Sequence, residues 1–154
     1  MEHKLSAHSE MNGFLEKYNY FHDALLKSVK FSSNDFFSDK PPNLEITGQF
    51  NAALSIHHYN YLENTGQTIY CISVELCELG LFSFCSTDGE ERSRHWALTK
   101  IEIDPLKDAP GRWLMTIISN TLDVVTGKWI KMNLAQIEFA YLVFRVVPRK
   151  STNQ

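Results

Sequence analysis

Two short stretches of this 154-residue chain place histidine beside tyrosine and asparagine: YNYFHD at 18–23 and HHYNYLEN at 57–64. Imidazole can bind a metal ion or transfer protons near neutral pH. His57 and His58 lie in a stretch that alternates like a strand, so their side chains should point to opposite faces. They cannot both bind one metal ion without a break in that strand, and the chain has no His-x-His pair. The spacing therefore predicts no metal site, unless His22, Asp23 and one of the pair lie on adjacent strands.

The dipeptide His22-Asp23 has the form of the motif in metal-dependent phosphohydrolases of the HD type. Those enzymes are all-helical and need further ligands from other helices, whereas this dipeptide precedes a predicted strand. We expect instead that Asp23 fixes the entrance of the strand and that His22 forms a local hydrogen bond.

Other catalytic patterns are missing from the sequence. It has no Gly-x-Ser-x-Gly elbow, no glycine-rich phosphate loop and no Cys-x-x-Cys pair. The carboxylates of Glu102 and Asp104 share one face of an amphipathic strand, as solvent-facing residues do. The three cysteines fall in apolar strands, where a thiol stays protonated: Cys71, Cys77 and Cys85. We expect no cofactor and a protein that is not an enzyme.

The hairpin of 53–61 and 67–76 assigns the two neighbouring histidines to faces. Its apolar residues match only if His58 joins Leu54 and Ile56 against the apolar face of the second strand. We therefore expect His58 to be a core histidine with a hydrogen-bond partner. His57 falls on the other face, near Cys71 or Ser73, and is the better contact residue. Its predicted neighbours on that face are Ser55, Tyr59 and Tyr61.

The predicted fold is mainly β (α+β): a bent antiparallel sheet or an open barrel of about 7–8 strands with a short N-terminal helix. Helical spacing relates Met11, Phe14, Leu15 and Tyr18, and Ser9 is the expected cap. No helix alternates with the strands, so a parallel sheet is not expected. The predicted units are a flexible arm at 1–8, a single β-rich domain at 9–148 and a tail at 149–154.

Several strand boundaries follow from the pattern of apolar residues and prolines. In the strand 21–31, Leu25, Val29 and Phe31 are predicted to share one face, with Lys27 between them. The stretch 32–43 is predicted to be a loop that ends at two prolines, and 44–50 a strand in which Gly48 marks a bulge. The longest predicted strand is 136–147, which Pro148 ends.

Charge and composition exclude several partners. The net charge is −3 and the pI about 6.0, without the basic face that nucleic-acid binding requires. The chain has no run of 18 apolar residues, so we expect no membrane span. The N-terminus does not look like a signal peptide. An odd number of cysteines suits the reducing cytoplasm. An acidic surface would suit a basic protein partner, and the sequence leaves oligomerisation open, a homo-oligomer included.

The three tryptophans each fall near the start of a predicted strand: Trp96, Trp113 and Trp129. Aromatic residues at strand starts could ring one end of a barrel and line a pocket there. The alternative is that they fill the core, where aromatic side chains contribute most of their burial.

The stretch FHDALLKSVKF at 21–31 resembles the first strand of a loosely defined group of small bacterial β-rich proteins, some of which look like immunity proteins of polymorphic toxin systems. The strands ALSIHHYNY and QIEFAYLVFRVV are also similar to that pattern, so the resemblance covers roughly residues 18–148. It implies a non-enzymatic binding role and carries over no catalytic residue.

Together these observations predict a non-catalytic cytoplasmic binding protein, in its most concrete form an immunity-type protein that binds a protein partner through His57, Tyr59 and Tyr61. The alternative is an open β-barrel that binds a small molecule, as a binding protein or as an enzyme, and whose mouth is lined by His22, Asp23, His57 and a tryptophan such as Trp96.

Overall fold

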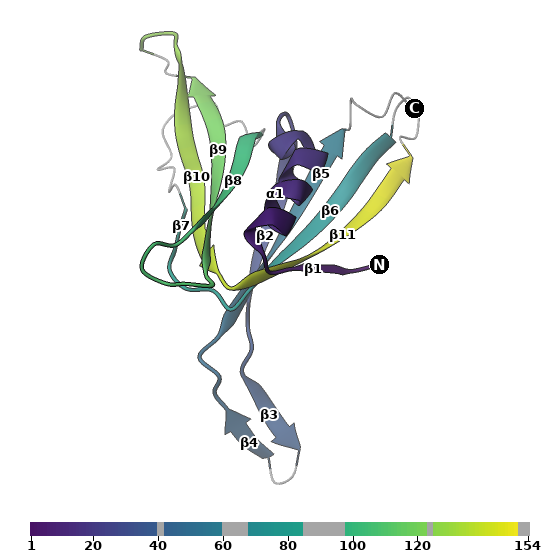
Figure 1. Ribbon diagram of the computed structural model, residues 1–154, viewed down its shortest axis with the longest axis vertical. Helices are drawn as coiled ribbons and strands as arrows, with labels where there is room; N and C mark the ends of the chain where they lie inside the picture. The colour runs from purple at the N-terminus through teal and green to yellow at the C-terminus, as the bar shows by residue number, and fades with distance from the viewer. Residues whose placement is uncertain (40–41, 60–67, 85–97, 123–124, 151–154) are drawn as a thin grey trace.

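The structure is a computed structural model, and it describes residues 1–39, 42–59, 68–84, 98–122 and 125–150 (Figure 1). These residues form eleven strands, one α-helix and one 3-10 helix. In chain order they are β1 (His3–Leu5), α1 (His8–Lys17), η1 (Asn19–Phe21), β2 (Leu25–Ser33), β3 (Phe36–Asp39), β4 (Pro42–Glu45), β5 (Phe50–Tyr59), β6 (Thr68–Cys77), β7 (Phe82–Phe84), β8 (Leu98–Pro105), β9 (Trp113–Leu122), β10 (Trp129–Phe139) and β11 (Tyr141–Lys150).

The strands form two main antiparallel sheets and one separate hairpin. Sheet I has the order β1-β11-β6-β5-β2, and sheet II has the order β7-β10-β9-β8. Strands β3 and β4 pair only with each other among the described residues. The prediction of a mainly β protein with antiparallel sheets and an N-terminal helix is confirmed. The sheets do not close into a barrel, and there are more strands than the seven or eight predicted.

The two sheets meet at a corner where the chain crosses from one sheet to the other twice, from β6 to β7 and from β10 to β11. Strand β10 passes into β11 at Ala140, whose N–H donates to the carbonyl of Cys77 at the end of β6. Beyond that point, Gly80 and Glu138 are joined by a backbone hydrogen bond of 2.9 Å. The stretch 136–147, predicted as one strand, is therefore divided between two sheets. The bend leaves sheets I and II facing each other, with α1 between them (Figure 1).

Helix α1 fills the space between the sheets with the residues that its spacing predicted. Met11, Phe14 and Leu15 are buried, as is Tyr18 directly after the helix. They join one core with inward residues of both sheets, and burial of such apolar surface stabilises the fold. Ser9, the predicted cap, already lies within the helix. Instead, the carboxylate of Glu10 accepts hydrogen bonds from two backbone N–H groups before the helix, those of residues 6 and 7, which lowers its pKa.

A hairpin of β3 and β4 projects away from the two sheets (Figure 1). We call residues 34–49 the arm. Phe36 pairs with Glu45 and Phe37 pairs with Leu44, so the loop predicted at 32–43 is wrong for most of its length. The strand predicted at 44–50 is also divided, because β4 ends at Glu45 and β5 begins at Phe50. Gly48 has φ +66° in this connection, so it permits a turn between strands and not a bulge within one.

Three further local expectations differ from the structure. Residues 3–5 were predicted to be part of a flexible N-terminal segment at 1–8, but they form β1 and pair with β11. The register of β2 shifts between Leu26 and Ser28, so Lys27 occupies a bulge and Leu25 moves to the face opposite Val29. Strand β11 continues through Pro148. Pro148 pairs with Tyr70 of β6 on one side, whereas β1 pairs only with residues 142–144, so no described strand lies beside Pro148 on the other side, where a missing N–H is tolerated.

Candidate functional site

The two neighbouring histidines of β5 lie on opposite faces of sheet I, as predicted. His58 is 2% exposed, and its ring meets the edges of Tyr18 and Phe21 at centroid distances of 6.0 and 5.8 Å. Burial lowers the pKa of His58, because desolvation disfavours the charged imidazolium. Its Nδ1 has no hydrogen-bond partner among the described residues. The core position of His58 is therefore confirmed, but the partner expected for it is not found at Nδ1.

His57 lies in a row of side chains that crosses four strands on the outer face of sheet I. The register places Leu25 of β2 beside His57, His57 beside Cys71, and Cys71 beside Val147 of β11. Leu25 and Val147, at the two ends of this outer row, are 40% and 46% exposed, and His57 and Cys71 are half-buried. The prediction that His57 lies near Cys71 on the face opposite His58 is confirmed.

The next rows of the outer face have small side chains at their centre. Ser55 lies between Ser28 and Ser73, and Ala53 lies between Lys30 and Glu75. In the part of the chain that the structure describes, α1 packs against the inner face and no element covers the outer one. Of the other predicted contact residues, Tyr59 is half-buried on β5 beside Ile69. Tyr61 lies outside the described residues.

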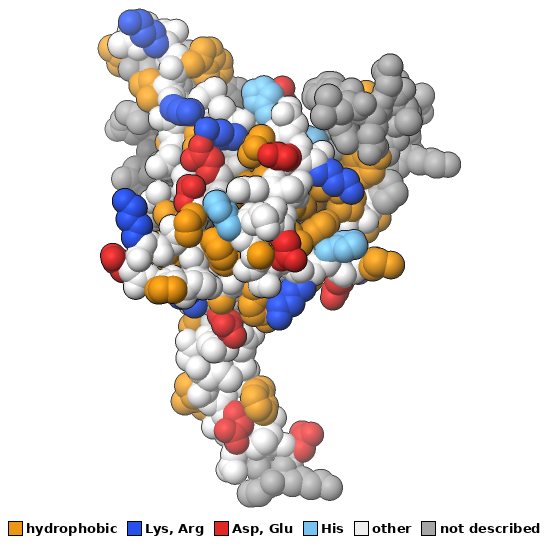
Figure 2. Space-filling model, viewed as in Figure 1, with side chains coloured by type: hydrophobic (Ala, Val, Ile, Leu, Met, Phe, Trp, Pro, Cys, Tyr) orange, Lys and Arg blue, Asp and Glu red, His pale blue; other side chains and the backbone are white. Residues whose placement is uncertain are grey.

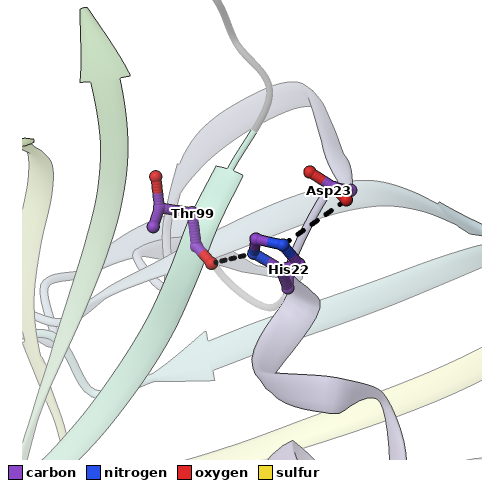
Figure 3. Close-up of polar contacts among 3 residues, drawn as sticks. All are labelled: His22, Asp23 and Thr99. Atoms are coloured by element: carbon purple, nitrogen blue, oxygen red, sulfur yellow. Dashed lines mark hydrogen bonds and ion pairs between the residues drawn. The ribbon is translucent and has the colours of Figure 1, made fainter. Parts of the chain in front are cut away.

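The dipeptide His22-Asp23 fixes the junction between η1 and β2 against the start of β8 (Figure 3). The imidazole Nδ1 of His22 is 3.0 Å from the carbonyl oxygen of Thr99, and its Nε2 is 3.5 Å from the Asp23 carboxylate. The N–H of Asp23 donates to the carbonyl of Leu98, and the N–H of Leu98 donates to the carbonyl of Ala24. The hydrogen bond predicted for His22 is thus present, but it joins Thr99, 77 positions away, and is not local. Asp23 fixes the strand entrance through its backbone.

A shallow pocket of about 300 Å³ adjoins His22. Its described lining residues come from η1 and β8: Asn19, Tyr20, His22, Thr99, Lys100 and Glu102. Lys100 and Glu102 form an ion pair with each other. Asp23 and His57 are not among the described lining residues, so the structure does not bring His57 into one pocket with His22 and Asp23. No serine, threonine or cysteine activated by a base is seen among the residues that line it.

A larger cavity of about 480 Å³ lies between the edge of β2 and strand β7. We call it the β2–β7 groove. Phe31 of β2 stacks on Phe82 of β7 at 4.7 Å and meets Phe84 edge-on at 5.6 Å. The described lining residues are mostly apolar: Leu25, Leu26, Lys27, Ser28, Val29, Phe31 and Phe84. Sequence reasoning missed this groove, although the alternation of Phe82 and Phe84 was a signal that both face the same side.

The remaining candidate residues do not assemble a site. Among the described residues, no three His, Cys, Asp or Glu side chains are placed to hold a metal ion. Trp113 packs against the core at the start of β9, whereas Trp129 is 60% exposed at the start of β10. The register puts them at opposite ends of the β9–β10 hairpin, so these two do not ring one end of a barrel. Trp96 lies outside the described residues.

The two described cysteines, Cys71 and Cys77, carry free thiols. Cys77 is buried and Cys71 half-buried, and neither forms a disulfide. Burial raises the pKa of the Cys77 thiol, which keeps it protonated and poorly nucleophilic. Cys85 lies outside the described residues.

The length of the helices and the likeness to known proteins complete the description. No helix in the described ranges is both long and apolar enough to cross a membrane. No protein-family model, curated protein or solved structure matches the chain.

Proposed function

We propose that the protein is a non-catalytic binding protein and that the outer face of sheet I contacts a protein partner. The observation that carries this proposal is the outer row of Leu25, His57, Cys71 and Val147, which crosses four strands without a described element above it. Apolar side chains that stay exposed in a contiguous group mark interaction surfaces.

The shape of this face favours a protein over a small molecule. Small ligands bind in concave sites that surround most of their surface, whereas the β2–β7 groove reaches this face only at its edge, at Leu25 and Ser28, and the pocket beside His22 has no described lining residue on it. The centre of the outer face instead carries small residues such as Ala53, Ser55 and Ser73, over which a flat protein surface can approach the sheet closely. His57 lies within this face, between Leu25 and Cys71.

Charge distribution refines what the partner should look like. The net charge of −3 attracts a basic protein at long range. The outer face itself differs, because Lys30 and Arg145 are exposed there and Glu75 is the carboxylate between their strands. A partner should therefore be basic overall but place acidic or polar side chains against this face. A toxin bound by an immunity-type protein remains the most concrete form of this proposal.

Photo-crosslinking tests the proposal with a matched pair of positions. A photoreactive phenylalanine analogue replaces Ser73 on the outer face or, as the control, the exposed Ser83 on β7 of sheet II. We expect one defined protein to be crosslinked from position 73 and not from 83 in the cells that make the chain. His57→Ala in the Ser73 background should weaken that product. Equal products from both positions, or none from position 73, would contradict the proposal.

The alternative of a small-molecule-binding protein keeps one supporting observation, the β2–β7 groove of about 480 Å³, which has the size of a ligand site. Of the residues first assigned to it, His22 lines the smaller pocket, whereas Asp23 and His57 are not among the described residues that line either pocket. Thermal unfolding in the presence of a metabolite and metal library separates the two functions. A shift produced by one ligand class and abolished by Val29→Trp would favour the alternative.

A further inference from the structure

The arm exposes large apolar side chains that the rest of the chain leaves uncovered. Phe37 and Leu44 are directly paired, so their side chains share one face of the hairpin, and Ile46 follows Leu44 by two positions. Phe37 is 72% exposed, Leu44 54% and Ile46 73%. A two-stranded hairpin is only marginally stable by itself in water. This face of the arm is therefore expected to pack against another molecule.

The base of the arm is held in place by a compact hydrogen-bonded turn. One carboxylate oxygen of Asp35 accepts hydrogen bonds from the N–H and the hydroxyl of Thr47 at 2.7 and 3.1 Å, and from the N–H of Gly48 at 3.3 Å. These bonds, the one from the Thr47 N–H above all, lower the pKa of Asp35. Below them, the N–H of Asn34 donates to the carbonyl of Gln49. The arm thus leaves the body in a fixed direction, which reduces the entropy lost when it binds.

The β2–β7 groove is the complementary feature on the same chain. In the described part of the fold β2 pairs only with β5, so one edge of β2 faces the groove. The aromatic residues at the groove are partly exposed, Phe31 at 42% and Phe84 at 37%. An apolar projection and an apolar groove with a strand edge are the two halves of a strand- or hairpin-docking interface.

The charges of the arm and of β2 are opposite. Residues 34–49 carry three carboxylates, Asp35, Asp39 and Glu45, and one lysine, whereas β2 carries Lys27 and Lys30 and no carboxylate. Figure 2 shows hydrophobic and acidic side chains on the described part of the arm and no basic one. Lys27 and Lys30 are exposed and form no ion pair with a described residue. Opposite charge favours and orients the contact between the two surfaces.

We propose that two copies of this chain associate, with the arm of each copy seated in the β2–β7 groove of the other. Each copy supplies one arm and one groove, so a single two-fold axis satisfies both surfaces on both copies. The occupant of the groove is then the face of Phe37, Leu44 and Ile46, which Asp39 shares, while Glu45 lies on the opposite face of the hairpin. In the dimer, these two carboxylates approach Lys27, which lines the groove, and Lys30, which follows it on β2. This association differs from the proposed function in its partner, although the two surfaces meet at the edge strand β2: Leu25 and Ser28 belong to the outer face and also line the groove, and Lys30 lies beside both.

A charge exchange tests the proposal in the purified full-length chain by sedimentation velocity. The groove variant is Lys27→Glu/Lys30→Glu, and the arm variant is Asp39→Lys/Glu45→Lys. We expect the wild type to dimerise and each variant alone to dimerise at least tenfold more weakly, since each then opposes like charges in both contacts. An equal mixture of the two variants should form a heterodimer, because every arm then meets a groove of opposite charge.

An apolar pair of variants checks the same interface independently of charge. Phe37→Ser/Ile46→Ser should abolish the dimer, whereas Val125→Ser, which changes a side chain that is 94% exposed on the β9–β10 connection, should leave it intact. Phe37, Ile46 and Val125 all lie outside the core. The melting temperature of the monomer should therefore change little in either variant, which would show that each is folded.

The outcomes decide between this proposal and its rivals. A wild type that stays monomeric at about 1 mM overturns it, as does a dimer that survives the Phe37/Ile46 double variant or variants that fail to complement each other on mixing. Crosslinking from Ser73 to a different protein is unaffected by any of these results. A monomeric wild type with a specific Ser73 product would therefore remove the dimer and keep the proposed function.

Discussion

The two faces of strand β5 differ in burial, although their residues alternate along one stretch of ten. On the inner face, Leu54, Ile56 and His58 are at most 2% exposed and contact the core. On the outer face, Ser55 and His57 are half-buried beneath no described element. This difference is the basis of the division that we propose: the inner residues stabilise the fold, and the outer residues serve recognition.

The substitution with the largest expected effect on stability is Ile56→Ala, which tests the inner face. Ile56 is fully buried between β2 and β6, so its truncation removes apolar contacts and leaves a cavity that costs about 2–5 kcal/mol. Its neighbour Ser55 faces the other way, and Ser55→Ala should change the free energy of unfolding by less than about 0.5 kcal/mol. Urea denaturation of both variants measures the contrast. Comparable losses for the two would mean that the outer face is covered and that the division is wrong.

The second test uses pH, because the buried histidine resists protonation. The pKa of His58 is lowered in the folded protein, whereas in the unfolded chain it is about 6.5. Below that pH the unfolded state binds a proton that the folded state does not, so stability falls as the pH falls. The loss begins near the unfolded pKa and ends below the folded one. Equilibrium unfolding between pH 8 and 5 should show this slope.

Two substitutions test whether the change of stability with pH comes from the inner face of β5. His58→Leu should make the dependence on pH shallower over the same range, while His57→Leu should leave the part caused by His58 in place. The chain contains five other histidines, so the difference between the two variants is the quantity to compare. Equal slopes in His58→Leu and the wild type would exclude His58 as the cause.

The division between the two faces of β5 could be predicted from the sequence because it depends only on local alternation. Side chains at positions 54, 56 and 58 share a face wherever the strand lies in the fold, so the opposite positions of His57 and His58 follow from the pattern alone. The burial of Met11, Phe14 and Leu15 followed from helical spacing for the same reason. Local periodicity thus fixed the faces of single elements.

Features that depend on contacts between distant residues could not be predicted in that way. The bulge at Lys27 arises from pairing with β5 and reverses the faces of Leu25 and Leu26. The bend at Ala140 requires the carbonyl of Cys77, which no local pattern around 136–147 reveals. The arm was missed because its turn chemistry, centred on Asp35 and Thr47, joins residues twelve positions apart. The candidate groove depends on both the bulge and the bend, so it was missed as well.

The third test concerns the helix that covers the inner face. Gly13 lies within α1, and a methyl group at its Cα would meet no atom within 4 Å. Gly13→Ala should therefore stabilise the protein by about 0.5–1 kcal/mol, because alanine loses less backbone entropy in a helix. Gly48→Ala is the control of opposite sign, since Gly48 has φ +66° and alanine is strained there. Thermal unfolding should rise for the first and fall for the second; a loss with Gly13→Ala would mean that the helix is more closely packed than described.

The smallest expected effect on stability comes from the residue that matters most for the proposed function. His57 is half-buried on a face without a described cover, so His57→Ala should change the free energy of unfolding by less than about 0.5 kcal/mol. The same substitution should reduce crosslinking from Ser73, because it removes a side chain from the middle of the outer row. Stability and binding respond separately only if the outer face serves recognition and the inner face serves folding. A variant that loses both together would show that His57 helps to hold the strands of sheet I, and its row would no longer be a reason to place the partner there.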